Sequence, residues 1–194
     1  MPRAGLTRQR IVDEAALIAD EQGFDHLTLA MLAGRLSVRV PSLYKHVAGL
    51  ADVKTLLSEQ CRRELVTEIE HVTIGRAGNE AIRALALTIR EWAKAHPGKY
   101  AATVPVPRSQ GLTSVATDQA TAVLLNVISR GYSLTDTEAI HQARAFRSAV
   151  HGFVALELAG GFGIPVDIDE SFAWMVEGYL YQFDKRNEDL SNPE

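Results

Sequence analysis

An all-helical fold is predicted by three features of the 194-residue sequence. Apolar residues recur at the three- and four-residue spacing of an amphipathic helix along nearly the whole chain. No run alternates between apolar and polar residues with the period of two that a half-buried strand requires. Glycine and proline gather between the amphipathic segments, where helices usually end. We therefore expect helices throughout and no sheet.

Three short helices are expected at the start of the chain. The first follows Thr7, a residue type that caps helix starts, and ends before Gly23. Thr28 begins a second helix, which ends near Ser37. Pro41 lies in the first turn of a third, where a missing N–H costs nothing.

Longer helices follow, at about residues 50–71, 79–96, 112–130 and 136–159, and a last one capped by Asp169 runs to about Lys185. Residues 97–111 hold three prolines and two glycines, which predicts a loop, with one turn of helix around Tyr100 as an option. The tail from residue 187 is expected to fray. The first helices form a compact module, so we expect two domains, residues 1–48 and 49–194.

Composition excludes several classes of protein. The hydrophobic fraction of 46% supports a folded core, and the lone Cys61 cannot form an internal disulfide. No apolar run approaches the roughly 18 residues of a membrane helix, and acids interrupt the first 20 residues, where a signal peptide needs an apolar run. A soluble, cytoplasmic protein without membrane contact is expected.

The charge distribution bears on the kind of partner. With 20 Lys+Arg and 24 Asp+Glu the net charge is −4, which argues against nucleic acid. Residues 35–54, however, hold four basic groups (Arg35, Arg39, Lys45 and Lys54) and only one acid, Asp52. A local basic face on an acidic protein is compatible with a polyanionic partner.

The segment Thr28–Val47, TLAMLAGRLSVRVPSLYKHV, has the helix, turn and second short helix of a helix-turn-helix. The second helix must bury Leu43 and Val47. The polar groups that it then presents outward lack a carboxylate that would repel phosphates, as groove reading requires. These outward residues are Arg39, Ser42, Tyr44, Lys45 and His46.

This segment, followed by a long helix, resembles the TetR family of transcriptional regulators, whose recognition helix reads like Ser42-Leu43-Tyr44-Lys45-His46-Val47. A second block, from Phe146 through His151-Gly152-Phe153 to Phe172, resembles the C-terminal domain of a TetR subgroup marked by a His-Gly-Phe motif. The resemblance implies a helix-turn-helix DNA-binding domain joined to a helical ligand-binding and dimerisation domain. The implied function is sequence-specific transcriptional regulation, as a repressor released by a small molecule.

The resemblance also implies which residues touch DNA. It assigns phosphate contacts to Thr28 and Tyr44, and positions at or beside the bases to Arg39, Pro41, Ser42, Lys45 and His46. Three positions depart from the family pattern: Ser37 where glycine is frequent, Arg39 where a capping serine is frequent, and Leu50 where a DNA-contacting lysine often stands. Lys54, one turn later, is a candidate replacement for that lysine.

Reading DNA in this manner requires two modules about one helical turn apart, and therefore a homodimer on a near-palindromic operator. A stripe of mostly small residues in the helix 136–159 offers an interface: Ala145, Ala149, Gly152, Leu156 and Ala159. On the following helix the matching residues are Phe172, Met175, Val176 and Tyr179. The alternative is that the same faces pack within one chain.

In TetR-like proteins a small molecule enters a cavity among the middle helices and shifts the two DNA-reading modules. The candidates here for contacting it are Cys61, Leu65, Trp92, His96, Tyr100, Phe146 and His151. Their apolar and aromatic character favours a largely hydrophobic or aromatic effector. Taken singly, each of these residues is more often part of a core.

Two other functions stay open at this point. Glu68 and His71, and again Glu138 and His141, have the Glu-x-x-His spacing with which helical di-metal carboxylate enzymes bind iron. Such a site needs a further inward glutamate from each of two other helices, and Glu138 lies in a first helical turn, where acids are favoured anyway. The other alternative is a helical protein-interaction adaptor. We expect no enzyme activity, no metal and no cofactor.

Overall fold

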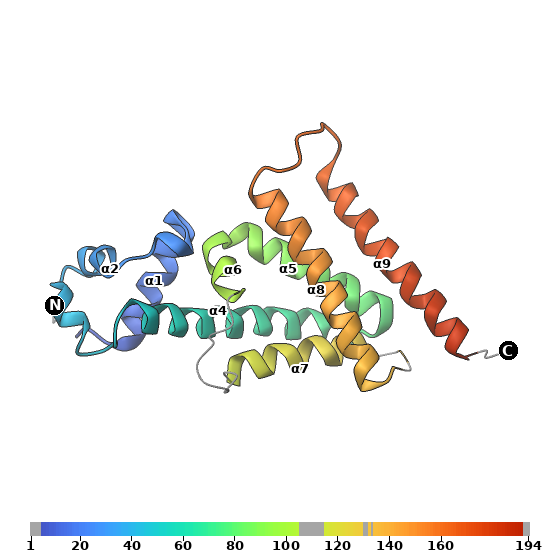
Figure 1. Ribbon diagram of the computed structural model, residues 1–194, viewed down its shortest axis with the longest axis horizontal. Coiled ribbons are helices and arrows are strands. Elements are labelled where there is room, and N and C mark those ends of the chain that lie inside the picture. The colour runs from blue at the N-terminus through green and yellow to red at the C-terminus, as the bar shows by residue number, and fades with distance from the viewer. Residues whose placement is uncertain (1–4, 105–114, 130–131, 133, 192–194) are drawn as a thin grey trace. The chain divides into compact units, whose positions relative to one another are not determined.

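The computed structural model describes residues 5–104, 115–129, 132 and 134–191, and within these ranges the chain is helical without a strand, which confirms the all-α prediction (Figure 1). None of the helices in the described ranges is long and apolar enough to cross a membrane. The elements are α1 (Arg8–Gln22), the 3-10 turn η1 (Phe24–His26), α2 (Leu29–Arg35), α3 (Val40–Leu43), α4 (Leu50–Thr73), α5 (Gly78–Ala95), α6 (Pro97–Thr103), α7 (Val115–Ser129), α8 (Asp136–Leu158) and α9 (Ile168–Ser191).

Threonine caps fix the starts of three helices. The hydroxyls of Thr7 and Thr28 accept hydrogen bonds from the backbone N–H groups of Arg10 and Met31, as the sequence predicts. Thr135 caps α8 in a reciprocal capping box with Glu138.

The predicted cap of α9 is wrong. Asp169 lies inside the helix, and the side chain of Asp167 accepts the N–H groups of Asp169 and Glu170 instead. The helix also continues to Ser191, beyond the predicted end near Lys185.

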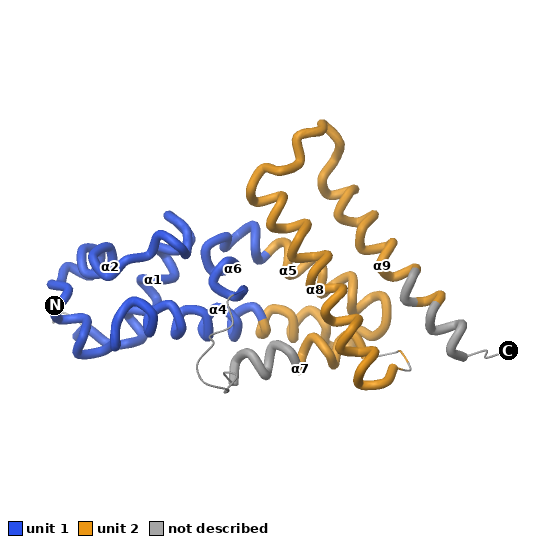
Figure 2. Tube along the Cα trace, in the orientation of Figure 1, with its two compact units in different colours: residues 1–65, 92–120 blue, residues 66–91, 121–194 orange. Residues whose placement is uncertain are grey.

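The chain divides into two compact units, coloured separately in Figure 2. Unit 1 contains residues 1–65 and 92–120, and unit 2 contains residues 66–91 and 121–194. The helices α4 and α5 therefore each contribute to both units. The domain boundary at residue 48 that the sequence predicts stays a prediction.

The core of unit 1 is built on α1, whose buried side is entirely apolar. Ile11, Ala15 and Ile18 are fully buried there, at helical spacing. Side chains from η1, α2, α3 and the first half of α4 complete the same cluster, among them Phe24, Leu32, Leu43, Val53, Leu57 and Cys61. The elements η1, α2 and α3 are too short to be stable alone, and this shared burial holds them together.

Residues 97–104 correct the prediction of a loop. Pro97 and Gly98 begin a real helix, α6, because proline is tolerated in a first turn. The helix packs closely on α1: a β-carbon added at Gly98 would lie 1.8 Å from the Ala19 carbonyl oxygen. The Asp20 carboxylate accepts the backbone N–H of Lys99 at 2.8 Å, which ties the start of α6 to α1. Residues 105–111, the rest of the predicted loop, lie outside the described residues.

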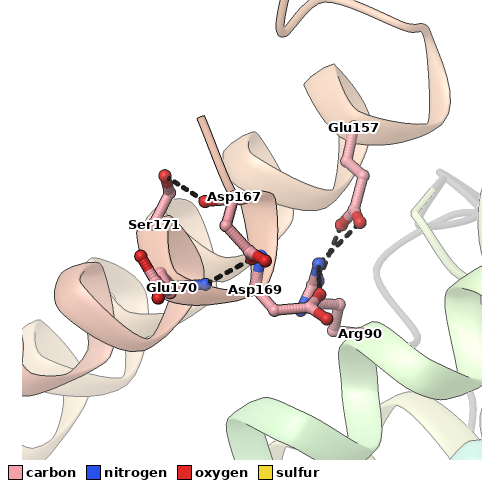
Figure 3. Close-up of polar contacts among 6 residues, drawn as sticks. All are labelled: Arg90, Glu157, Asp167, Asp169, Glu170 and Ser171. Atoms are coloured by element: carbon pink, nitrogen blue, oxygen red, sulfur yellow. Dashed lines mark hydrogen bonds and ion pairs between the residues drawn. The ribbon is translucent and has the colours of Figure 1, made fainter. Parts of the chain in front are cut away.

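Unit 2 is organised around Arg90 of α5 (Figure 3). The Arg90 side chain is 3% exposed and pairs with Glu157 near the end of α8 and Asp169 in the first turn of α9. Its guanidinium also lies over the Phe172 ring, 4.8 Å from the centroid. Arg83 adds a more exposed pair with Glu177 of α9. These contacts hold α5, α8 and α9 together.

Candidate nucleic-acid interface

Helix α2, a turn and helix α3 form the predicted helix-turn-helix within unit 1. The backbone reverses at Ser37, which has a φ of +53°. That left-handed conformation favours glycine. This explains why glycine is frequent at the corresponding position in the TetR family, which this segment resembles. Hydrogen bonds from Leu36 N–H to the Leu32 carbonyl and from Val38 N–H to the Ala33 carbonyl close the turn.

Residues 39–47, the recognition segment, sort into an inner and an outer face as predicted. Leu43 and Val47 are 0% and 2% exposed, and both belong to the core. Tyr44 is 57% exposed, although its ring is a large apolar group that carries a polar hydroxyl. The other predicted contacts on this segment are exposed at Arg39, Pro41 and Lys45 and half-buried at Ser42 and His46. Thr28 is exposed at the start of α2.

Two of the four cations counted between residues 35 and 54 are engaged within unit 1. The Arg35 guanidinium donates to the Glu14 carboxylate at 2.8 Å and to Glu21 at 2.7 Å. Its hydrogen bonds to Glu21 and then to Glu14 raise the pKa of Arg35 above its ordinary value, and the hydrogen bond from Arg35 lowers the pKa of Glu21. Arg35 therefore links α2 to α1 and contributes little positive potential.

Lys54, the candidate replacement for the missing lysine at position 50, is the second engaged cation. Its ammonium lies 4.8 Å from the Phe24 ring centroid and 3.4 Å from the Asp25 carbonyl oxygen. These contacts direct the side chain to η1. The DNA contact assigned to Lys54 stays a prediction, and the basic surface of this segment reduces to Arg39 and Lys45.

Arg8 is a further candidate at this surface that the sequence pattern does not single out. This arginine begins α1, and its Nε–H donates to the backbone carbonyl of His46 at 3.1 Å, across 38 residues of chain. A signal for it exists in the sequence: the first turn of α1 contains Arg8 and Arg10 but no acid, although acids are favoured at that end of a helix.

The predicted effector contacts divide between the two units. In unit 1, Cys61 and Tyr100 are buried, while Leu65, Trp92 and His96 are half-buried. Burial raises the pKa of the Cys61 thiol to about 12, so this thiol is unreactive in the folded chain. Trp92 and His96 meet edge to face with ring centroids 5.5 Å apart, and His96 Nδ1 lies 3.3 Å from Asp20. In unit 2, Phe146 is buried and His151 is half-buried.

The predicted dimer residues also divide, by exposure. On α8, Ala145, Leu156 and Ala159 are exposed, and Ala149 and Gly152 are half-buried. On α9, Phe172 and Val176 are buried, whereas Met175 and Tyr179 are half-buried.

Contacts within the same chain engage two of the predicted residues on α9. The Phe172 ring packs on Phe153, and the Tyr179 hydroxyl donates to Gln142 of α8. Among the side chains of α9 that the structure describes, Trp174 and Tyr181 are the most exposed large apolar residues, at 81% and 68%.

One of the two Glu-x-x-His pairs of the di-metal alternative, Glu138 and His141, includes a residue that has a structural role. The Glu138 carboxylate accepts the backbone N–H and the hydroxyl of Thr135 in the capping box of α8. Within the part of the chain that the structure describes, no group of three or more His, Cys, Asp or Glu side chains could hold a metal ion.

Comparisons with known proteins give a consistent result. Residues 82–179 match the family model described as "Tetracyclin repressor-like, C-terminal domain". An uncharacterized HTH-type transcriptional regulator of Mycobacterium tuberculosis is 35% identical over 175 residues, which cover 89% of this chain and 79% of that protein. An HTH-type transcriptional regulator of Bacillus subtilis, also uncharacterized, is 34% identical over 180 residues, covering 92% and 93% of the two chains.

Among solved structures, the TetR family protein ActR of Streptomyces coelicolor in complex with (S)-DNPA superposes with a TM-score of 0.68 at 20% identity. That superposition covers 95% of this chain and 100% of ActR. The similarity extends over nearly the whole chain and includes both units.

Proposed function

We propose that this chain, which belongs to the TetR family of DNA-binding transcriptional regulators, is a repressor. It binds a near-palindromic operator as a homodimer and is released when a small, largely hydrophobic or aromatic effector binds. The family consists of regulators and not of enzymes, which removes the catalytic alternative.

The observation that carries the proposal is the outer face of the recognition segment. Tyr44, Lys45 and Arg39 are exposed together on a segment whose inner residues, Leu43 and Val47, are anchored in the core. A guanidinium and an ammonium suit guanine edges or phosphates, and a phenol suits phosphates. In this proposal Lys45 and Arg39 read base edges and Tyr44 and Thr28 bind the backbone.

A dimer is required because one short segment makes too few contacts for specificity. Two copies related by a two-fold axis present two recognition segments to successive major grooves. The exposed apolar groups on the last two helices support this assembly: Leu156 is 52% exposed on α8, and Trp174 is 81% exposed on α9. Such side chains contribute to an interface when they form one contiguous apolar patch.

Regulation by an effector is supported by similarity and by composition. ActR was crystallised with the small molecule (S)-DNPA. In this chain the candidate contacts Trp92 and Tyr100 are aromatic, and Cys61 is apolar in behaviour because its thiol stays protonated. The effector acts by binding more tightly to the conformation that is released from DNA.

Selection of genomic fragments by the purified full chain tests this proposal. Bound fragments are sequenced, and the enriched motif is resynthesised as a duplex. We expect one near-palindromic motif whose half-sites are separated by about one helical turn, roughly 10 bp. Enrichment that follows fragment length alone, with no shared motif, would contradict specific DNA binding.

A further inference from the structure

Arg8 joins the first helix to the far end of the recognition segment. Its Nε–H donates to the carbonyl oxygen of His46 at 3.1 Å, and His46 directly follows Tyr44 and Lys45. The guanidinium therefore lies beside the residues to which the proposed function assigns DNA contacts. Arg8 itself is exposed.

One contact uses only part of this side chain. A guanidinium has five N–H donors in a planar fork, and the Nε–H alone reaches the His46 carbonyl. The two Nη amino groups carry the other four donors on an exposed side chain. A planar pair of amino groups matches the geometry of phosphate oxygens better than an ammonium does.

Few exposed cations lie at the recognition segment, so the charge of Arg8 adds substantially to the positive surface there. Arg35 is held by Glu14 and Glu21, and Lys54 is held over Phe24. The exposed cations at the recognition segment are then Arg39 and Lys45, few for a polyanionic ligand. A third cation that contacts the same segment from α1 extends the positive surface beyond the helix-turn-helix itself.

We propose that Arg8 binds a DNA phosphate through its Nη groups while its Nε–H holds the His46 carbonyl. This inference rests on the proposed function and adds a DNA-binding residue outside the helix-turn-helix. A single guanidinium that makes both contacts fixes the end of the recognition segment relative to the sugar-phosphate backbone. Arg8 thereby sets the depth at which Lys45 reaches the bases.

Salt-dependent binding separates phosphate contact from a merely structural role. The logarithm of the binding constant falls with the logarithm of salt concentration, with a slope of about 0.9 per phosphate neutralised. Fluorescence anisotropy titrations measure this slope with the selected operator duplex and with a scrambled duplex of equal length. The salt concentration runs from roughly 50 to 300 mM KCl, over which the Debye screening length shortens. The variants are Arg8→Gln, Arg8→Lys and the control Arg144→Gln, which removes an exposed charge from unit 2.

For Arg8→Gln we expect the slope to fall by about 2 per dimer, since each chain loses one phosphate contact, and the affinity to fall roughly tenfold on both duplexes. Arg8→Lys keeps the charge and should keep the slope while binding less tightly than the wild type. Arg144→Gln should match the wild type. Circular dichroism checks that each variant retains its helices.

An Arg8→Gln variant that is folded and has the wild-type slope would overturn the phosphate contact, even if its affinity falls. Equal affinity of the wild-type protein for the operator and the scrambled duplex would instead contradict the proposed function. The slope on the scrambled duplex still tests Arg8 in that case, because phosphate contacts do not depend on sequence.

Discussion

Arg90 and Glu157 form a two-pronged ion pair in which Nε and one Nη atom each lie 2.7 Å from a carboxylate oxygen (Figure 3). The same Nη atom contacts Asp169 at 2.6 Å. The side chains of Arg90 and Glu157 are only 3% and 12% exposed, whereas Asp169 is 77% exposed. The hydrogen bond with Glu157 raises the pKa of Arg90 above its ordinary value against the opposing effect of burial.

Replacing Arg90 with methionine should lower the free energy of unfolding by roughly 3 kcal/mol. The change leaves the Glu157 carboxylate buried without its cation, and removing one partner of a buried pair costs more than the pair contributes. Urea denaturation at fixed protein concentration measures the difference. Arg83→Gln is the matched control, because the Arg83–Glu177 pair is 44% and 54% exposed and should contribute less than about 1 kcal/mol. Equal losses in the two variants would contradict this assignment.

Replacing Gly98 with alanine should destabilise the contact between α6 and α1. The added β-carbon would meet the Ala19 carbonyl at 1.8 Å, and backbone cannot give way as a side chain can. Overpacking of this kind costs roughly 1–3 kcal/mol. Gly34→Ala is the control, since a β-carbon there meets nothing within 4 Å and alanine favours a helix. The thermal midpoint should fall for Gly98→Ala and hold or rise for Gly34→Ala. A Gly98→Ala protein with the wild-type midpoint would mean that α6 is not packed on α1 in this way.

Alanine at Lys45 and at Lys54 should have different effects. Lys45 is exposed on the recognition segment, so its loss should weaken operator binding by about 1–3 kcal/mol and leave the thermal midpoint unchanged. Lys54 lies over Phe24, so its loss should cost roughly 0.5–1 kcal/mol of stability and change operator affinity less than that of Lys45→Ala. Fluorescence anisotropy measures the operator affinity of both variants, and thermal melts measure their midpoints. If Lys54→Ala weakens binding as much as Lys45→Ala, Lys54 contacts DNA as the sequence predicts.

Acidification should weaken the fold through His151. Burial, and then the charge of Arg147, lower the pKa of His151 below its ordinary value near 6.5. Above that value the imidazole is neutral in both states and adds no pH dependence. As the pH falls below it, the unfolded chain takes up the proton more readily than the folded chain, so stability is lost. The free energy of unfolding should therefore decrease less between about pH 7.5 and pH 5 for His151→Gln than for the wild type. The control is His141→Gln, an exposed histidine on the same helix, and an identical pH response in all three proteins would refute the assignment to His151.

Features set by neighbouring residues could be predicted from the sequence. The caps at Thr7 and Thr28 depend on a hydroxyl and an N–H three residues away, and both are confirmed. The burial of Leu43 and Val47 follows from helical spacing and is confirmed as well. The cap of α9 is Asp167, two residues before the predicted Asp169, because aspartate at either position is a suitable cap by residue type.

Features set by distant residues could not be predicted. Pro97 and Gly98 are typical of a loop, and only the proximity of Ala19 explains why a glycine begins a packed helix there. The charge on Arg35 counts as basic in a tally of the sequence, whereas its partners Glu14 and Glu21 lie 21 and 14 residues away. Arg8 and His46 are separated by 38 residues, so their contact appears only once the fold is known. Pairings across such separations depend on tertiary packing, which local periodicity does not specify.

In the proposed function, two copies of this chain read one near-palindromic operator through their recognition segments. The most direct measurement is the affinity ratio between the selected operator and a duplex with one half-site scrambled, determined by anisotropy together with the stoichiometry from analytical ultracentrifugation. We expect two chains per operator and a preference of at least about 100-fold for the intact site, because each mismatched base pair typically costs about 1–3 kcal/mol. One chain per duplex, or equal affinity for the intact and half-scrambled sites, would contradict it.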